Sequence, residues 1–349
     1  APSELLARDQ NQGPDLDLID TYEPSPETLR AIALEAEDAA RAIGGVTNSD
    51  GGSASSGSGV FALATSHGFS GAYGSTSHSI SASVVGGEGA DKQRDNAWRS
   101  AHHHADLPSP AEIGRLAGER TVAKLNPGKL RSGTMPVVFD PRVSASLVGH
   151  LLGAISGSAI ARRSSFLLDK LGEPIFAPGI TIADNPHVPR GLRSRLFDGE
   201  GLPTSSRNLV EDGRVTGWLL DSASARQLNL APTGHAARSG GGAPGVSTGN
   251  VHLAAGTLSP AELMADIADG VYVTELIGQG VNGVTGDYSR GAAGFWIENG
   301  KLTYAVSEVT IAGHLLDIFK SLTPANDLAF RYGVNAPTVR IEGLTIAGR

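Results

Sequence analysis

A single histidine, His150, lies in a long uncharged stretch over 143–160 that is expected to form a helix. The metal-binding helix of a zinc peptidase holds two histidines on one metal. A glutamate beside the first histidine acts as general base on the metal-bound water. Here the next residue is Leu151, the next histidine is His187, and no Asp or Glu lies between Val143 and Leu168. The sequence therefore predicts a helix with the position of a metal site but without its chemistry, and His150 is interpreted as a core or lightly polar histidine.

A second candidate is the segment 286–291, where four polar side chains stand between two glycines. They are an acid, a phenol, a hydroxyl and a guanidinium, in the order Asp287, Tyr288, Ser289 and Arg290. The pattern approaches the nucleophile elbow G-x-S-x-G, but Asp287 replaces the first glycine. Composition alone favours a tight inter-strand loop with an Asp–Arg pair. The functional alternative is a loop on the substrate side, without a nucleophile.

Two further motifs resemble ligand sites but lack the context that would make them work. Residues 278–283 match G-x-G-x-x-G after an expected strand, yet no helical periodicity follows to receive a pyrophosphate. The three adjacent histidines at 102–104 would point to opposite sides of a strand, or ~100° apart on a helix. We interpret the first match as accidental and the histidines as part of a solvated loop before the helix that follows Ser109.

The elements that must position these residues are capped helices and hairpin strands. Ser followed by Pro begins three expected helices, because Ser is a good N-cap and Pro is tolerated at the first helical position. These starts are Ser25, Ser109 and Ser259, and further helices are expected over 143–163 and 314–322. Strands are expected over 60–85 and 271–277, with hairpin turns at 211–213 and 299–300. Hairpins outnumber strand–helix–strand units, so we expect an α+β fold with a largely antiparallel sheet or partial barrel and packed helices.

Several segments are unusually rich in glycine or serine. Segments 48–59 and 238–250 are poor in structure-forming residues, and the second is expected to be a flexible or backbone-exposing loop. The stretch 143–160 carries glycines at 149, 153 and 157, a spacing that brings membrane helices together. Ser and His dilute it, so we expect a buried core helix that packs closely along its glycine face.

Composition excludes several classes of function. The 349-residue chain has a formal net charge of −8 with no basic stripe, which argues against a general nucleic-acid binder. It has no cysteine, so His, Asp and Glu are the strong metal ligands that remain. Ala1 opens a polar segment rather than a signal sequence, and we expect a cytoplasmic location.

Several segments, taken in order, resemble the TldE (PmbA) branch of the TldD/PmbA metallopeptidase family. They are 149–172, 196–230, 233–236, 273–313 and 344–348, with weaker matches at 14–20 and 47–53. The resemblance covers nearly the whole chain and implies a TldD/PmbA-like fold. It assigns 1–135 to the remainder of the N-terminal and middle region, with the family's N-terminal part absent. It assigns 136–349 to the C-terminal domain, which contains a degenerate metal-site helix at 143–163.

The resemblance also implies roles for individual residues. The TldD subunit of this family carries an H-E-x-x-x-H helix that binds the catalytic zinc, and the TldE subunit lacks it. In this chain His150 takes the first histidine position, Leu151 the glutamate position and Ile155 the second histidine position. We therefore expect no cofactor in this subunit and zinc in a TldD-type partner. The four side chains at 287–290 would make substrate-side or interface contacts.

The implied assembly is a heterodimer that encloses a chamber, degrades unfolded or short peptides and processes peptide precursors, with no nucleic-acid or membrane partner. Two other functions stay open. One is a self-sufficient peptidase or hydrolase that uses Ser289 or scattered histidines. The other is a peptide-binding module without catalysis, which would bind peptides but cleave none even beside a TldD-type subunit.

Overall fold

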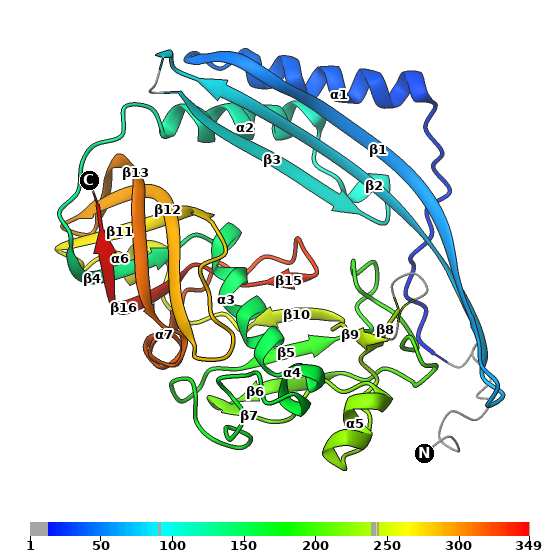
Figure 1. Ribbon diagram of the computed structural model, residues 1–349. Coiled ribbons are helices and arrows are strands. Elements are labelled where there is room, and N and C mark those ends of the chain that lie inside the picture. Colours follow the sequence, from blue (N-terminus) through cyan, green and yellow to red (C-terminus); the bar gives the residue numbers. More distant parts are fainter. Residues whose placement is uncertain (1–12, 90–91, 239–241, 243, 349) are drawn as a thin grey trace.

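The computed structural model describes residues 13–348, apart from 90–91, 239–241 and 243 (Figure 1). An N-terminal layer consists of a three-stranded antiparallel sheet, in the order β1-β2-β3, with two helices on one face. The larger C-terminal part contains a barrel and a second sheet. The elements of the N-terminal layer are α1 (Pro26–Arg41), β1 (Val46–Ala64), β2 (Ser70–Gly86), β3 (Gln93–Ala101), the short 3₁₀ helix η3 (His104–Asp106) and α2 (Pro110–Ala123).

Helices α1 and α2 begin where the sequence predicts. The Ser25 and Ser109 hydroxyls each accept a hydrogen bond from a backbone N–H in the first turn of the helix, so both residues act as N-caps. The helices cover the sheet with small apolar side chains that interlock with those of β2 and β3: Ala36, Ala40, Ile80, Ala82, Val84, Ala97, Ile113 and Ala117. A Cβ at Gly114 would collide with the Ala36 carbonyl group of α1, so glycine lets the two helices approach closely.

The Ser- and Gly-rich segment 48–59 is not poor in structure; it forms most of strand β1. It pairs with β2 along its whole length, from Val46 opposite Gly86 to Ala64 opposite Ser70. Backbone hydrogen bonds hold this ladder, and they do not depend on bulky side chains. The small side chains have a packing reason, since a Cβ at Gly52 would collide with the Ala33 carbonyl oxygen of α1.

The C-terminal part is built on a closed barrel in the order β13-β12-β11-β4-β16, in which β13 pairs again with β16. The one parallel pair in the barrel is β4 with β11, and the other neighbours are antiparallel. The α+β class, with largely antiparallel strands and packed helices, is therefore confirmed. The elements are β4 (Gly133–Phe139), β11 (Asp269–Ile277), β12 (Asp287–Glu298), β13 (Lys301–His314) and β16 (Val339–Ala347), with β14 (Thr323–Pro324) at the edge and α6 (Pro260–Met264) and α7 (Leu315–Ser321) beside them.

A second sheet, in the order β15-β10-β5-β6-β7, lies below the barrel in Figure 1. Its strands are β5 (Ile182–Asn185), β6 (Arg207–Glu211), β7 (Arg214–Val215), β10 (Asn250–Leu253) and β15 (Val334–Asn335). The expected hairpin around 211–213 is present, although its second strand is short. Nearby lie α5 (Ser222–Leu228) and the small pair β8 (Ala236–Ala237) and β9 (Gly245–Val246). Of the expected loop 238–250, residues 239–241 and 243 lie outside the described part.

Helix α3 (Pro141–Ala154) contacts strands of both the barrel and the second sheet. The helix expected over 143–163 is divided, because the backbone at Ile155 and Gly157 exchanges hydrogen bonds with Leu219 before α4 (Gly157–Ala161) begins. The expected close packing along the glycine face is present at Gly157, where a Cβ would lie 2.8 Å from the Leu219 carbonyl oxygen, but not at the other two glycines. Gly149 and Gly153 are exposed, and a Cβ at either would meet nothing within 4 Å.

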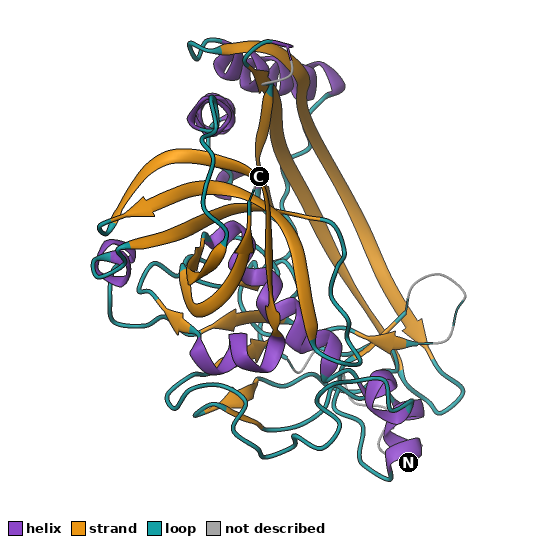
Figure 2. Ribbon diagram, turned by 60° about the vertical axis from the view of Figure 1, so that its left-hand side comes forward, coloured by secondary structure: helices purple, strands orange, loops and turns teal. Residues whose placement is uncertain are grey.

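The β1–β2 hairpin runs as a long arm from the helices of the N-terminal layer to the loops around the second sheet (Figure 2). Near its tip, three aromatic rings surround Phe197. The ring centroid of Phe197 lies 5.0 Å from that of Phe69, 6.0 Å from Phe61 and 5.5 Å from Tyr73. This cluster fixes the tip of the arm to the C-terminal part.

The other end of the N-terminal layer is fixed by a buried ammonium group. Lys124, at the end of α2, places its Nζ 2.9 Å from Asp95 Oδ2 on β3 and 2.6 Å from Glu275 Oε2 on β11. Arg142 of α3 also faces Asp95, at 3.5 Å. The sheet, the barrel and α3 therefore meet at one set of charges.

Candidate functional site

Helix α3 and its C-cap residue Ile155 carry the three positions that the sequence predicts to be a degenerate metal site. Leu151 and Ile155 are both 0% exposed and belong to the main hydrophobic core. His150 is half-buried. Two of the three positions are therefore packing positions, and substitution by Glu or His there would put a polar group into the core.

The side chains around His150 do not fit a zinc ion. A zinc site needs three or four N, O or S donors converging on one point. In the part of the chain that the structure describes, no group of three or more His, Cys, Asp or Glu side chains is placed to hold a metal. The groups that the structure places against His150 include the ring of Tyr288 and the positive charge of Arg290, and neither is a carboxylate or a second imidazole. The expected lack of a cofactor in this subunit stays a prediction.

His150 instead faces Tyr288 of strand β12. Their rings meet edge to face, with centroids 5.9 Å apart and planes at 80°. Burial lowers the pKa of His150, and the charge of Arg290 lowers it further. Burial also raises the pKa of Tyr288 to about 12. Within the described residues, His150 Nε2 and Tyr288 Oη are both buried and neither has a hydrogen-bond partner.

The four side chains at 287–290 do not converge. They lie in strand β12 rather than in a loop, so neighbouring side chains alternate between its two faces. Asp287 and Ser289 are exposed, whereas Tyr288 is 1% exposed and points into the core. The structure forms no Asp–Arg pair here. Asp287 accepts a hydrogen bond from Thr285 Oγ1, and Arg290 Nε donates to the Ile277 carbonyl.

Ser289 lacks the surroundings of a serine nucleophile. Such a serine needs a base within hydrogen-bonding distance. The Ser289 hydroxyl makes no hydrogen bond within the described residues, and the residue opposite it on β13 is Ala312. The nearest histidine in the strand register is His314, opposite Asp287. Its Nε2 bonds to the Thr285 carbonyl, and its Nδ1 accepts the N–H of Leu316 at the start of α7.

His314 is a residue that the sequence did not single out. It joins the loop before β12 to the start of α7, and it fixes the loop that precedes residues 287–290. The match to G-x-G-x-x-G falls in this same loop, which leads into strand β12 and not into a helix. The loop therefore does not open a helix whose N-terminus could receive a pyrophosphate. The expected helix over 314–322 begins at His314, whereas in the structure His314 is the N-cap and α7 begins at Leu315.

The three histidines at 102–104 are half-buried and bonded, which corrects the expectation of a solvated loop. The ring of His102 bonds to the carbonyls of Thr76 and Gly191. His103 bonds to Asp17, and the ring of His104 packs on that of Tyr22. Each ring therefore has a different partner, and the three do not converge on one ion.

None of the helices in the described residues is long and apolar enough to cross a membrane. The stretch 143–160, which resembles a membrane segment in its glycine spacing, is divided between α3 and α4.

The chain combines a central sheet layer with a C-terminal barrel, and α3 contacts both the barrel and the second sheet; its two parts match models of the PmbA/TldA metallopeptidases. The model of the central domain of that family matches residues 19–125, and the model of its C-terminal domain matches residues 132–348. The chain belongs to this family, in its PmbA (TldE) branch.

Individual relatives agree with this placement. The chain is 43% identical to the metalloprotease PmbA of Escherichia coli O157:H7, over 100% of this chain and 75% of that protein. It is 37% identical to a PmbA homologue of Haemophilus influenzae, with the same coverage. A crystal structure from Bacteroides thetaiotaomicron, described as a putative modulator of DNA gyrase, has a TM-score of 0.88 and 30% identity over 99% of this chain and 78% of that one. TldE from Thermococcus kodakarensis shares the fold, with a TM-score of 0.81 and 23% identity over 98% of this chain and 80% of that one.

Proposed function

We propose that this chain is the metal-free partner subunit of a TldD/TldE heterodimeric zinc metallopeptidase that degrades unfolded or short peptides. One observation carries the proposal: the positions that would hold the general base and the second zinc ligand contain Leu151 and Ile155, both 0% exposed in the core. A single histidine cannot hold a catalytic zinc, which takes three protein ligands. The metal and its activated water would come from the TldD-type subunit, and this chain would complete the substrate chamber.

Residues 287–290 would contact the partner subunit or the peptide substrate and would take no part in the hydrolysis itself. Asp287 and Ser289 lie on the exposed face of β12, where they are free to contact a second chain. Tyr288 anchors the strand in the core, and Arg290 gives its interior side a positive charge. The net charge of −8 supports the absence of a nucleic-acid partner.

The test compares the hydrolysis of an unstructured peptide by three samples: this chain, a TldD-type paralogue from the same organism, and an equimolar mixture. The proposal predicts cleavage by the mixture that a chelator abolishes, and no cleavage by this chain alone. Metal analysis of the separately purified subunits should find zinc in the paralogue and less than about a tenth of an equivalent in this chain. Cleavage by this chain alone would refute the proposal.

The alternative of a self-sufficient hydrolase has a direct test in Ser289→Ala. Removal of a serine nucleophile lowers kcat by about a million-fold, whereas loss of a peripheral contact changes KM by tenfold or less. We expect Ser289→Ala to change the KM of the mixture by about tenfold or less, because Ser289 has no base beside it within the described residues. The peptide-binding module would be favoured if the mixture bound the peptide without cleaving it.

A further inference from the structure

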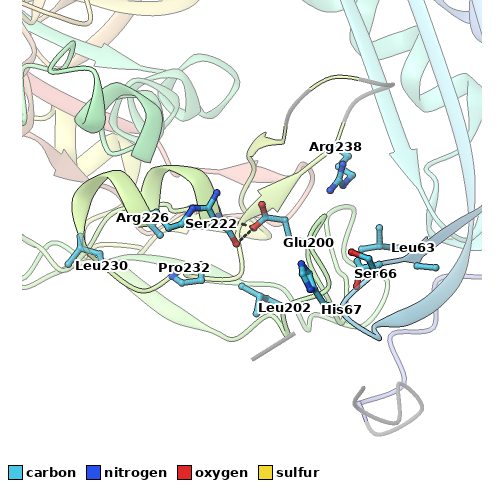
Figure 3. Close-up of a pocket in the computed structure, with 13 residues that line it drawn as sticks. Leu63, Ser66, His67, Glu200, Leu202, Ser222, Arg226, Leu230, Pro232 and Arg238 are labelled. Atoms are coloured by element: carbon cyan, nitrogen blue, oxygen red, sulfur yellow. Dashed lines mark hydrogen bonds between the residues drawn. The ribbon is translucent and has the colours of Figure 1, made fainter. Parts of the chain in front are cut away.

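A cavity of about 690 Å³ lies where the tip of the β1–β2 hairpin meets the loops of the C-terminal part (Figure 3). One side consists of residues 63–67 at the hairpin tip, and the other of residues from the loop after Phe197, helix α5 and the segment that follows it. The cavity shares no residue with α3 or β12. Its volume is within the range of roughly 300–1,000 Å³ that is typical of small-ligand sites.

Two arginines line this cavity without an ionic partner. Arg226 is exposed on α5, and the Nε of Arg238 donates a hydrogen bond of 2.7 Å to the Gly199 carbonyl. Neither guanidinium lies within salt-bridge distance of a carboxylate in the described part of the chain. In Figure 3 they approach from different sides of the cavity, with Glu200 between them. Planar guanidinium groups with free N–H donors are suited to bind a carboxylate.

The acidic residue of the cavity is held in place by its neighbour. Glu200 Oε2 accepts hydrogen bonds from the Ser222 backbone N–H, at 2.8 Å, and from the Ser222 hydroxyl, at 2.6 Å. The Oε1 atom makes no hydrogen bond within the described residues, so it is free to accept one from a ligand amide N–H. The side chain of Glu200 is thus oriented for a ligand, and it leaves both arginines available.

Thr65, Ser66 and His67 add polar groups at the hairpin tip, and the apolar part of the wall comes from both sides of the junction. It consists of Leu63, Leu202, Leu230 and Pro232, with Ala64 and Ala225. The cavity therefore combines two free guanidinium groups, one oriented carboxylate and a surface for a hydrocarbon side chain. A short peptide with a free carboxyl end and an apolar last residue offers the complementary groups.

We propose that this cavity binds the carboxyl end of a short peptide. Arg226 and Arg238 bind the terminal carboxylate, Glu200 Oε1 accepts a peptide N–H, and the leucines contact the last side chain. The proposal rests on the proposed function, because a peptidase complex supplies such peptides as products. It assigns to this subunit a product or peptide-end site that shares no residue with α3 or β12.

The experiment measures binding of the tetrapeptide Ala-Ala-Leu-Leu to this chain alone by calorimetry, beside the same peptide with a C-terminal amide. We expect the free acid to bind at least about tenfold more tightly than the amide, and Arg226→Gln to remove about tenfold of its affinity. The side chain of Arg226 is exposed and makes no hydrogen bond within the described residues, so this variant should fold. Arg162→Gln, an exposed arginine after α4, is the matched control and should bind as the wild type does. Sodium acetate and phosphate serve as competitors.

Equal binding of acid and amide, or unchanged affinity in Arg226→Gln, would overturn the inference. Displacement of the peptide by millimolar acetate or phosphate alone would also overturn it, since the site would then be a general anion site. The proposed function is tested separately by cleavage in the mixture. If the mixture cleaves peptides but this chain does not bind the tetrapeptide, the proposed function stands and the carboxyl-end site is refuted. If this chain binds the tetrapeptide but the mixture cleaves nothing, the site stands and the proposed function is refuted.

Discussion

The imidazole of His150 on α3 meets the phenol of Tyr288 on β12 edge to face, with the two ring centroids 5.9 Å apart. The contact joins α3 to β12 across the main core. It also buries two polar atoms, His150 Nε2 and Tyr288 Oη, without a partner in the described residues. Each of these properties leads to a measurable outcome.

Restoration of the zinc motif should fail because the positions are core positions. Leu151→Glu removes a fully buried side chain and introduces a buried carboxylate, which should lower the free energy of unfolding by about 3 kcal/mol or more. Leu151→Met is the control and should cost less than about 1.5 kcal/mol. Denaturant unfolding measures both. The double variant Leu151→Glu, Ile155→His should gain no zinc, because α3 ends at Ala154. One equivalent of zinc after dialysis would show that this interpretation of the helix is wrong.

The hydroxyl of Tyr288 should contribute little to stability. Because Oη has no partner in the described residues, Tyr288→Phe should change the free energy of unfolding by less than about 1 kcal/mol, whereas Tyr288→Ala should cost about 3–5 kcal/mol. A large loss in Tyr288→Phe would instead indicate that a bound group uses the hydroxyl.

Alkaline pH should destabilise the folded chain through the same residue. The pKa of Tyr288 is raised to about 12 by burial, whereas an unfolded tyrosine titrates near pH 10. Between these values the unfolded state binds fewer protons than the folded state, so stability falls as pH rises. Tyr288→Phe should reduce this slope, as measured by denaturant unfolding at pH 9 to 11. An unchanged slope would contradict the assignment.

Acid should destabilise the chain through buried histidines. Burial lowers the pKa of His150 in the folded state, so below about pH 6.5 the unfolded state takes up the proton first. Stability present above that pH is therefore lost as pH falls. His150→Gln should flatten the fall in the free energy of unfolding between pH 7 and pH 5. Part of the slope should remain, because the pKa values of His78, His187 and His252 are lowered by burial as well. A variant with the full wild-type slope would exclude His150 as a contributor.

Lys124 should hold the N-terminal layer to the barrel. Lys124→Ala leaves the buried Asp95 without its closest cation and should cost about 3 kcal/mol; Arg142 still faces Asp95 and limits the loss. Lys129→Ala, an exposed lysine nearby, should have little effect. Calorimetry should show a lower Tm for Lys124→Ala but not for Lys129→Ala. Equal Tm values in the two variants would mean that the buried charges do not fasten the layers.

Local signals in the sequence predicted much of the fold. Ser25 and Ser109 begin helices because a serine hydroxyl satisfies a free N–H of the first turn, and Asn299-Gly300 forms the β12–β13 turn with positive φ at both residues. Such features depend on a few neighbouring residues. Strand β1 could not be predicted from its side chains, since Ser and Gly carry little β propensity and only the partner strand and α1 explain them.

The site was harder to predict than the fold. Leu151 and Ile155 could be identified as incompatible with zinc, because that depends on residue type alone. The break after Ala154 could not, because it depends on hydrogen bonds to Leu219, far along the chain. The alternation of side chains at 287–290 was missed because the glycines suggested a loop. The cavity between the hairpin tip and α5 requires two segments far apart in the sequence, and no local pattern predicts it.

The aromatic contact between the hairpin tip and Phe197 has a consequence for synthesis on the ribosome. Phe69 is 4% exposed in the finished structure, and its ring packs on residues more than a hundred positions later in the chain. The hairpin can pair as soon as its own strands have emerged, but the rings at its tip stay uncovered until residue 197 and the residues after it have been made. During that interval the nascent chain exposes a cluster of aromatic side chains that is prone to non-specific association. The cluster becomes buried only when the C-terminal part folds against it.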